Sequence, residues 1–363
     1  MAVYIGYLLL AGLQLPFFCK RKLNHLYLDV DRYLRLCFLE LLLLAGLRGY
    51  TVGADTSAYL GALDFYGTYP KSELMRAVLV YPYHYEIGYF TLTKLSILFG
   101  LGKTGFLFLV ALLIYIPTFS AIKKYSPMPY ISILCYFAFG FFSFSLGIFR
   151  QMIAISILFC GRKYVEERKL AKYIVTVALA MTFHTTAIAG IVIYFLYGIN
   201  WRRIIVWLLP MEAVLLIAGR KIAMLLVSLF PRYASYVGSG HDNQGGTYLM
   251  LLMLNIVLLA SILFRDENQK KKDDVVICAL ILAILLQCVG YSMSTISRGV
   301  PYYSIYLIFA IPNVLVNLRN KMRHGWPQVI LFFVIICLFA LTFREFNGNY
   351  FVVPYYTVFN SPY

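Results

Sequence analysis

Four basic side chains at the ends of apolar segments could bind a phosphate-bearing group and move a proton. Arg48 follows one apolar run, Arg150 and Arg298 each begin another, and His184 ends a fourth. A guanidinium presents a planar fork of N–H donors that matches two phosphate oxygens, whereas an ammonium acts as a point charge. An imidazole has an unperturbed pKa of about 6.5, so it exchanges a proton near neutral pH. These four residues are the candidates from which a site would be built.

The spacing of two of these residues predicts that they meet. Arg150 opens the segment FRQMIAISILFCGRKYVEERK, and His184 ends the apolar run of KYIVTVALAMTFHTT. The turn between the two helices falls near residue 167, midway between them, so an antiparallel hairpin places both at one level. A single arginine at a helix end usually snorkels to lipid headgroups, and a lone histidine there is usually an interfacial residue. The shared level of all four basic residues favours a site.

Three carboxylates also stand out in or beside apolar segments. Asp55 lies in GADTSAY, shortly after Arg48, and Glu86 lies in YEIGYF. Each of these two could cap a helix N-terminus instead of taking part in chemistry. Glu212 lies inside an apolar segment, where it could relay protons, and a structural hydrogen bond explains it equally well.

The elements that must position these residues are membrane helices. The chain of 363 residues is 61% hydrophobic and 13% charged, whereas soluble domains carry about 25% charged residues. Apolar runs alternate with short polar breaks, which is typical of a polytopic all-α membrane protein. The net charge of +16 lies mostly in those breaks, so it indicates membrane orientation and not nucleic-acid binding. The cysteines and histidines show no disulfide or metal spacing, and we predict neither a metal nor a cofactor.

The positive-inside rule gives the helices an orientation. We place the basic breaks in the cytoplasm and the N-terminus, with Arg48, outside; the breaks are 20–22, 161–169, 200–203, 265–274 and 319–326. An odd number of apolar runs separates the first two breaks, so the most polar run, 86–101, is predicted to be a re-entrant or interfacial helix on the external side. About twelve spans remain: 3–19, 33–47, 104–122, 129–146, 149–165, 170–185, 186–199, 202–219, 247–264, 275–295, 299–317 and 327–344. The pattern predicts one integral membrane domain, 1–363, with an external loop plus the re-entrant segment at 48–103 and another external loop at 220–246.

Several short motifs together resemble the EpsG family, one of the groups of Wzy-type bacterial polysaccharide polymerases. They span nearly the whole chain in order: RGYTVGADTSAY (48–59), YEIGYF (85–90), FRQMIA (149–154) with RKYVEERK (162–169), FHTTAI (183–188), SRGVPYY (297–303) and VVPY (352–355). Where the family usually has proline in a Glu-Pro-Gly-Tyr stretch, this chain has Ile87, although Glu86 and Gly88 remain.

The resemblance implies a GT-C-like helical fold in the bacterial inner membrane and a polymerase of O-antigen or exopolysaccharide that acts at the external face. Donor and acceptor would be undecaprenyl-diphosphate-linked oligosaccharides, with membrane lipid and a chain-length regulator protein as further candidate partners. Arginines would stabilise the departing diphosphate and a base would take the acceptor proton. The expected catalytic residues are His184, then Asp55 and Glu86, and the expected substrate-binding residues are Arg48, Arg150, Arg298, Gln151, Tyr59 and Tyr89, the tyrosines by stacking on sugar rings.

Three other functions compete with this one. A flippase for lipid-linked oligosaccharides would also need a basic cavity, but a transporter should place its charges near the bilayer midplane and show an internal repeat. In this sequence the charges lie at one face and no repeat is found. An O-antigen ligase would perform the same chemistry on a different acceptor. The third is an integral-membrane acyltransferase, which would normally present its catalytic histidine with a cytoplasmic acyl-CoA route.

Overall fold

The computed structural model describes residues 1–22, 25–76, 85–228, 247–266, 270–322, 325–348 and 351–360. These residues are mostly helical, as the sequence predicts, with one short two-stranded hairpin as the exception. Contacts within the chain divide it into two compact units, where the sequence suggested one membrane domain. Unit 1 holds Met1–Cys160, Ala178–Ala187 and Gln328–Tyr363, and unit 2 holds Gly161–Val177 and Ile188–Pro327.

The helices of unit 1 begin and end where the sequence has caps and breakers. Asp29 caps α2 by accepting a hydrogen bond from the Arg32 N–H. Gly140, with φ at +78°, separates α7 from α8, which are bent by 60° relative to each other. The elements are α1 (Ala2–Gln14), η1 (Leu15–Phe18), β1 (Cys19–Lys22), β2 (His25–Leu28), α2 (Val30–Gly46), α3 (Thr56–Gly67), η2 (Lys71–Glu73), α5 (Ile87–Leu98), α6 (Gly102–Tyr125), α7 (Pro129–Ala138), α8 (Phe141–Gly147), α9 (Phe149–Cys160) and most of α19 (Trp326–Gly348).

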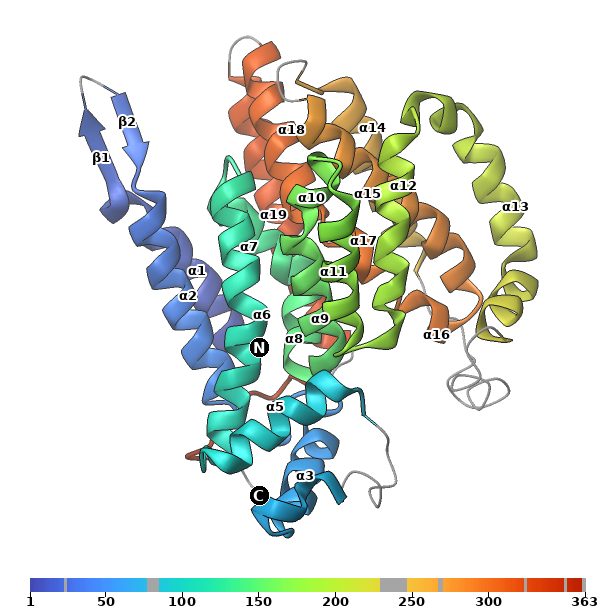
Figure 1. Cartoon of the computed structure of the whole chain (residues 1–363). Coiled ribbons are helices and arrows are strands. Elements are labelled where there is room, and N and C mark those ends of the chain that lie inside the picture. Colours follow the sequence, from blue (N-terminus) through green and yellow to red (C-terminus); the bar gives the residue numbers. More distant parts are fainter. Residues whose placement is uncertain are drawn as a thin grey trace. The chain divides into compact units, whose positions relative to one another are not determined.

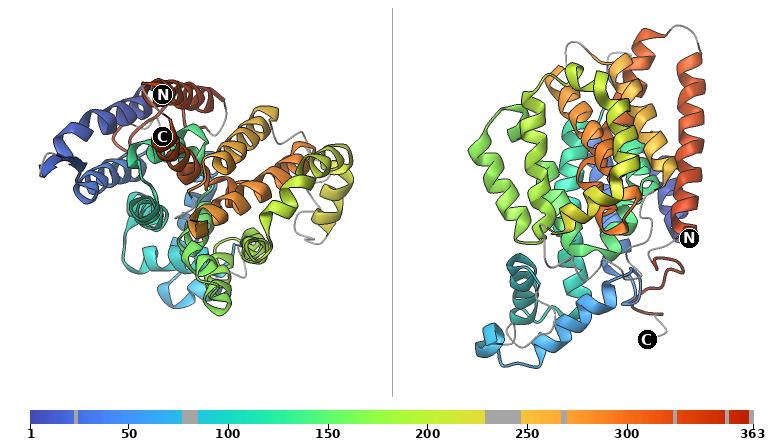
Figure 2. Two further views of the ribbon diagram at one scale, coloured as in Figure 1. Left: turned by 90° about the horizontal axis from the view of Figure 1, so that it is seen from above. Right: turned by 90° about the vertical axis from the view of Figure 1, so that its right-hand side faces the viewer.

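Unit 1 has two distinct ends. Figure 1 shows α3 and α5 together at the lower end, with α5 running obliquely across the end of α6, and the strands β1 and β2 at the upper end of α1 and α2. The side view in Figure 2 places the N-terminus and the C-terminal segment at the same end as α3. The predicted external motifs of unit 1 therefore gather at the end opposite to the basic β-hairpin.

Unit 2 is built around α15, whose residues from Val275 to Ile284 are largely buried. Helices α13 and α14 pack along it. Arg168, with φ at +54°, makes the turn between α10 and α11. The elements are α10 (Arg162–Glu166), α11 (Leu170–Met181), whose last residues belong to unit 1, η3 (Thr185–Gly190), whose first residues belong to unit 1, α12 (Ile191–Gly198), α13 (Trp201–Ser228), α14 (Tyr248–Leu263), α15 (Lys270–Tyr291), α16 (Ser294–Ser297), α17 (Pro301–Ser304) and α18 (Leu307–Lys321).

The number of spans differs from a simple count of apolar runs. Among the described residues, α6, α15 and α19 are long and apolar enough to cross a membrane, and the number rises to five if two bent helix pairs each form one span. Other apolar runs become helices of 10–17 residues, which are shorter than the roughly 20 residues a straight span needs. The structure therefore supports a helical membrane protein, while the twelve spans and the GT-C-like fold stay predictions.

The two predicted external loops contain more helix than the sequence suggested. Residues 48–103 hold α3, η2 and α5. Helix α13 continues to Ser228, into the segment predicted as an external loop from residue 220, and residues 229–246 lie outside the described residues.

Candidate active site

Glu86, directly before α5, joins Arg150 and His184 in unit 1. One carboxylate oxygen, Oε2, forms an ion pair with Arg150 Nη1, and the other, Oε1, lies 3.5 Å from His184 Nδ1. Thr185 supports Oε1 through its N–H at 3.4 Å and its hydroxyl at 3.3 Å. The side chains of Arg150, Glu86 and His184 keep 17%, 9% and 15% of their surface exposed, so the trio is shielded but still reachable. The structure brings together Arg150 and His184, as the hairpin spacing predicts, with Glu86 between them.

A glycine allows Glu86 to reach this position. The Gly88 N–H donates to the Thr182 carbonyl at 2.7 Å, which ties the first turn of α5 to the segment that ends in His184. A Cβ at Gly88 would lie 2.6 Å from Thr182 Oγ1 and 2.7 Å from the Thr182 carbonyl oxygen, closer than real Cβ atoms come. Glycine in Glu86-Ile87-Gly88-Tyr89 is therefore needed for close approach of two backbone segments.

Aromatic rings surround the guanidinium of Arg150. The Arg150 Nε–H donates to the Tyr59 hydroxyl at 3.4 Å, and the guanidinium carbon lies 4.6 Å from the centre of the Tyr85 ring. Tyr59 stacks on Phe149 at 4.7 Å and accepts, on its carbonyl, a hydrogen bond from the Tyr89 hydroxyl at 3.2 Å. Such contacts favour a charged guanidinium held in one orientation.

The tyrosines occupy different places from those the sequence suggested. Tyr59 and Tyr89 are buried among other rings, so in this structure they form the wall behind Arg150 and do not present a free face to a sugar. Tyr85, which is half-buried, presents its ring to Arg150 and was missed as a site residue. Its position directly before Glu86 in YEIGYF is the signal that could have identified it.

The environment of Glu86 keeps its carboxylate ionised. Burial by itself raises the pKa of Glu86, but the hydrogen bond with His184 and the positive charge of Arg150 outweigh it and lower the pKa to about 2. An acid with so low a pKa is a poor proton acceptor at neutral pH. His184 Nδ1 faces Glu86 Oε1 at 3.5 Å, so in a tautomer with the proton on Nδ1 the other ring nitrogen, Nε2, would be the one that can accept a proton.

Arg48 has a role different from the predicted one. Its side chain is fully buried, with Nε donating to the Val52 carbonyl at 3.3 Å, Nη2 to the Leu146 carbonyl at 3.0 Å and Nη1 to the Ala45 carbonyl. The guanidinium also packs against the Phe149 ring at 5.1 Å. A group enclosed in this way does not reach a diphosphate, so Arg48 instead ties its loop to the junction of α8 and α9, just before Arg150.

The rest of the RGYTVGADTSAY motif serves the same junction. Thr56 Oγ1 donates to the Leu146 carbonyl at 2.9 Å. Gly53 has φ at +110°, and a Cβ there would lie 2.2 Å from the Leu146 oxygen, so a side chain would separate the two segments. The motif therefore positions the start of α9.

The C-terminal segment completes this arrangement. Thr357 pairs with Arg48 in an antiparallel bridge, with hydrogen bonds from the Gly49 N–H to the Tyr356 carbonyl at 2.7 Å and from the Val358 N–H to the Leu47 carbonyl at 2.9 Å. The Gly53 N–H donates to the Phe351 carbonyl at 3.1 Å. The C-terminal segment, which includes the VVPY motif, thus lies against the loop that holds Arg48.

The remaining predicted site residues are placed as follows. Asp55 is exposed at the start of α3, makes no side-chain capping hydrogen bond and lies close enough to Tyr59 to affect it electrostatically. Gln151 is buried in α9 beside Arg150. Arg298 is exposed at the C-terminal end of α16 and belongs to unit 2. Glu212, also in unit 2, accepts a hydrogen bond from the Asn255 amide at 3.1 Å, which fits the structural explanation.

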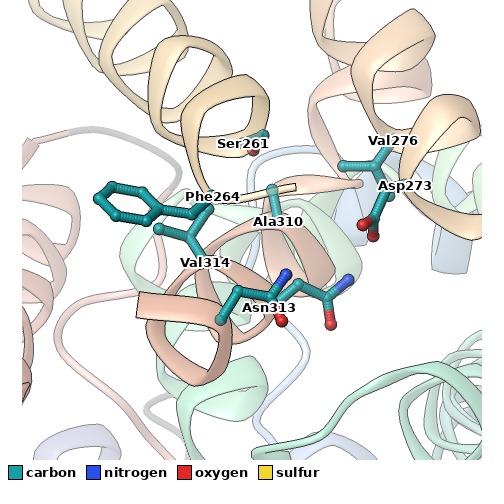
Figure 3. Close-up of a pocket in the computed structure, with 8 residues that line it drawn as sticks. Ser261, Phe264, Asp273, Val276, Ala310, Asn313 and Val314 are labelled. Atoms are coloured by element: carbon teal, nitrogen blue, oxygen red, sulfur yellow. The ribbon is translucent and has the colours of Figure 1, made fainter. Parts of the chain in front are cut away.

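A pocket in unit 2 differs from the site at Glu86 in the chemistry of its lining residues. It lies between α14, α15 and α18, and its lining residues are Ser261, Phe264, Asp273, Val276, Ala310, Asn313, Val314 and Asn317 (Figure 3). Asp273 already accepts a hydrogen bond from the Asp266 N–H at 3.1 Å. The lining contributes a carboxylate and two amides but no basic side chain, so it does not suit a phosphate-bearing substrate. Among the described residues, no group of three His, Cys, Asp or Glu side chains is arranged to hold a metal.

Comparison with known proteins identifies the family. A family model described as the EpsG family matches residues 31–357, which is most of the chain. No curated protein and no solved structure matches it. The chain therefore belongs to the EpsG family, as its motifs predict, and this membership indicates a general role in polysaccharide polymerisation by a membrane-embedded protein.

Proposed function

We propose that this member of the EpsG family is a glycosyltransferase that polymerises lipid-linked repeat units at the external face of the bacterial inner membrane. The donor is a glycan on undecaprenyl diphosphate, and the acceptor is the terminal sugar of a second unit carried on the same lipid. The observation that carries this proposal is the trio of Arg150, Glu86 and His184, which combines a phosphate-binding cation with an oriented base.

In the proposed reaction the acceptor hydroxyl attacks the anomeric carbon of the donor. The new bond forms between that oxygen and the anomeric carbon, and the bond from this carbon to the phosphate oxygen breaks. The leaving diphosphate keeps the electron pair, and the hydroxyl proton passes to His184 Nε2. Glu86 stabilises the imidazolium that results, as a carboxylate does behind a catalytic histidine.

Arg150 stabilises the negative charge that develops on the leaving diphosphate. Its Nη1 and Nε engage Glu86 and Tyr59, which fixes the plane of the guanidinium and leaves its other N–H groups for phosphate oxygens. Preorganised donors of this kind act strongly where water is excluded. A phosphate contact by Arg298 stays a prediction from the sequence, and exposed Asp55 is proposed as a carboxylate that orients the acceptor.

The proposed orientation is supported by the two ends of unit 1. Lys20 lies in the β-hairpin at one end, where it pairs with Asp29 at 2.6 Å, and Lys123 pairs with Asp31 at 2.6 Å. The Glu86 trio is built from α5, α9 and the segment after α11, and Figure 1 shows α5 at the other end. A basic end on the cytoplasmic side then puts the trio outside, where flipped lipid-linked units are present.

The test is gel analysis of surface polysaccharide in a strain without this gene. Glycans limited to a single repeat unit support the polymerase. Loss of all surface glycan, with lipid-linked units retained in the inner leaflet, would instead indicate a flippase. Full-length polymer that stays on its lipid carrier would indicate a ligase.

Complementation with variants connects the function to the site. Arg150→Lys keeps the charge but loses the fork, so we expect it to insert normally and to leave single repeat units. Arg76→Lys is the matched control, because Arg76 is 76% exposed in the same external region and its nearest acid is Glu73 at 3.7 Å. Normal polymer from Arg150→Lys would remove Arg150 from the catalytic role.

A further inference from the structure

Helix α2 has a buried face and an exposed face, and two arginines lie on the exposed one. The buried side chains are those of Tyr33, Leu34, Cys37, Leu41 and Ala45. Arg32 and Arg35 are exposed, and Leu39 and Leu43, each 52% exposed, follow them at steps of four residues. Residues three and four apart lie above one another on a helix. The arginines therefore continue the exposed apolar side of α2 towards its N-terminus.

An ion pair fixes the depth of these arginines beside a membrane span. Helix α6 is long and apolar enough to cross a membrane, and α2 packs along it. Lys123, in the last turn of α6, pairs at 2.6 Å with Asp31, in the first turn of α2. Arg35 lies four residues after Asp31, which is roughly 6 Å along the helix axis. Arg32 and Arg35 thus lie near the level at which the span ends, on a side of α2 that faces lipid.

Arg35 has no carboxylate partner within the part of the chain that the structure describes. Asp29 lies 2.6 Å from Lys20 and 3.5 Å from Arg32, and Asp31 pairs with the end of α6. Arg32 and Arg35 are also one helical turn apart, where like charges repel each other. A guanidinium on a lipid-facing surface needs an anion, and the phosphate of a lipid headgroup is the anion present at this depth.

The surrounding charges favour a lipid whose headgroup is anionic. Besides the two arginines, Lys20, Lys123 and Lys124 are exposed at this end of unit 1. Five basic side chains thus accompany the two carboxylates of Asp29 and Asp31. A zwitterionic headgroup would bring an ammonium into this positive surface together with its phosphate, whereas an anionic headgroup brings no such repulsion.

The direction of α2 suits contact with headgroups. Figure 1 shows the β-hairpin at the upper end of α1 and α2, so the N-terminus of α2 lies at that end. Long side chains of a helix lean towards its N-terminus, which directs Arg32 and Arg35 away from the hydrocarbon. Phe17, which is 85% exposed, and exposed Tyr27 lie between α1 and α2, and aromatic rings are common at this level of a membrane.

We propose that Arg32 and Arg35 form a binding site for an anionic phospholipid such as phosphatidylglycerol. The two guanidinium forks hold the oxygens of its phosphodiester, and its acyl chains lie along Leu39 and Leu43. The predicted orientation puts this lipid in the cytoplasmic leaflet. The site lies outside the Glu86 trio and does not depend on the proposed polymerase reaction.

Lipid titration of the purified full-length protein in detergent tests the site. Phosphatidylglycerol and phosphatidylethanolamine with the same acyl chains are added separately, and bound lipid is quantified by native mass spectrometry. The wild type should bind phosphatidylglycerol about tenfold more tightly than phosphatidylethanolamine. The double variant Arg32→Gln/Arg35→Gln should weaken binding of phosphatidylglycerol about tenfold and change that of phosphatidylethanolamine less than about twofold.

The matched control is Arg202→Gln/Arg203→Gln, which removes two exposed arginines of α13 from another basic break of the sequence. It should leave both affinities unchanged. Equal affinity of the wild type for the two lipids, or the same loss in the control, would overturn the proposal. Soluble glycerol phosphate that competes as strongly as the lipid would assign the site to a free anion and would also overturn it.

Cross-linking in liposomes tests the site without removing a charge. A benzophenone amino acid at position 39, on the same side of α2 as Arg35, should label phosphatidylglycerol in excess of its share of a mixture with phosphatidylethanolamine. At position 332, where α19 has an exposed phenylalanine, the same amino acid should label the two lipids in proportion to their amounts. Proportional labelling at both positions would overturn the proposal.

Discussion

Replacing Gly88 by alanine is the smallest change that should separate the members of the Glu86 trio. The added Cβ would lie 2.6 Å from Thr182 Oγ1, 2.7 Å from the Thr182 carbonyl oxygen and 2.9 Å from its carbonyl carbon. Two of these atoms are backbone, so rotation of a side chain does not relieve the clash. The start of α5 and the segment that leads to His184 must move apart.

The size of this movement follows from the contact distances. Ordinary Cβ contacts begin near 3.4 Å, so the two segments must separate by about 0.5–0.8 Å, and a misplacement of about 1 Å in a catalytic group can cost about 100-fold in rate. We therefore expect Gly88→Ala to lower the rate of polymerisation at least tenfold. The hydrogen bond from Gly88 to Thr182 is worth about 1 kcal/mol, and alanine in place of glycine stabilises a helix by a similar amount. The protein should therefore still fold.

The assay compares the initial rate of polymerisation in liposomes with the amount of protein in the membrane. Gly67→Ala is the matched control, because a Cβ at Gly67, the last residue of α3, meets nothing within 4 Å. Wild-type activity in Gly88→Ala would refute the claim that close approach at this glycine sets the geometry of the trio. An equal loss of activity in Gly67→Ala would show that any added methyl group in the region of α3 and α5 is harmful.

Four further predictions follow from the site. Arg48→Lys should lower the Tm of the solubilised protein by several degrees, because one ammonium does not serve three buried carbonyls and an unsatisfied acceptor costs about 1–3 kcal/mol; an unchanged Tm with lost polymer would return Arg48 to substrate binding. Truncation after Gly348 removes the tail that pairs with the Arg48 loop and should reduce membrane-inserted protein on immunoblots, whereas normal levels would make the tail dispensable. The pKa of Glu86 is lowered from 4.5 to about 2, so its stabilising effect is complete above about pH 4.5 and is lost as the pH falls towards 2; thermal unfolding at pH 3 and 7 should show this loss in the wild type but not in Glu86→Gln. In a cysteine-free background, a cysteine near Tyr69 should react with an impermeant thiol reagent from outside and one near Glu167 should not, and protection at Tyr69 would leave the proposed reaction without a substrate.

The sequence alone predicts the central pair of the site because helix geometry is regular. Arg150 and His184 lie equally far from the turn of one hairpin, and both contact Glu86 in the structure. Glu86 was recognised as a candidate from its place in YEIGYF. Its position between the two basic residues depends on how α5 packs against the segment at Thr182, and no spacing along the chain encodes that packing.

The role of Arg48 shows what the sequence does not contain. An arginine at the end of an apolar run is equally compatible with headgroups, with a substrate or with backbone carbonyls. In the structure the Arg48 side chain donates to the carbonyl of Leu146, and the Arg48 backbone pairs with Thr357 in an antiparallel bridge. Both partners are far from Arg48 along the chain. Contacts over such separations depend on the tertiary fold.

The span count differs for a related reason. Apolar runs reveal hydrophobic segments but not their breaks, and the predicted span 129–146 is divided at Gly140 into α7 and α8. This break has a consequence for the site. The carbonyl of Leu146, near the end of α8, is the acceptor for both Arg48 and Thr56. The bent helix pair α7–α8 thus ends at this junction, from which α9 starts with Arg150 in its first turn.

The position of Glu86 between two basic groups also explains how one carboxylate could serve both halves of the proposed reaction. Before the proposed proton transfer the charge of Glu86 is balanced by Arg150. When His184 takes the acceptor proton, a second cation forms 3.5 Å from the same carboxylate. The attraction of Glu86 is then shared between the imidazolium and the guanidinium, while the diphosphate gains negative charge. The positive charge on His184 offsets part of the negative charge of Glu86. Arg150 therefore stabilises the diphosphate more strongly while negative charge develops on it. Proton transfer and departure of the lipid diphosphate would therefore assist each other through a single ionised carboxylate, and for that role a pKa well below neutrality is required.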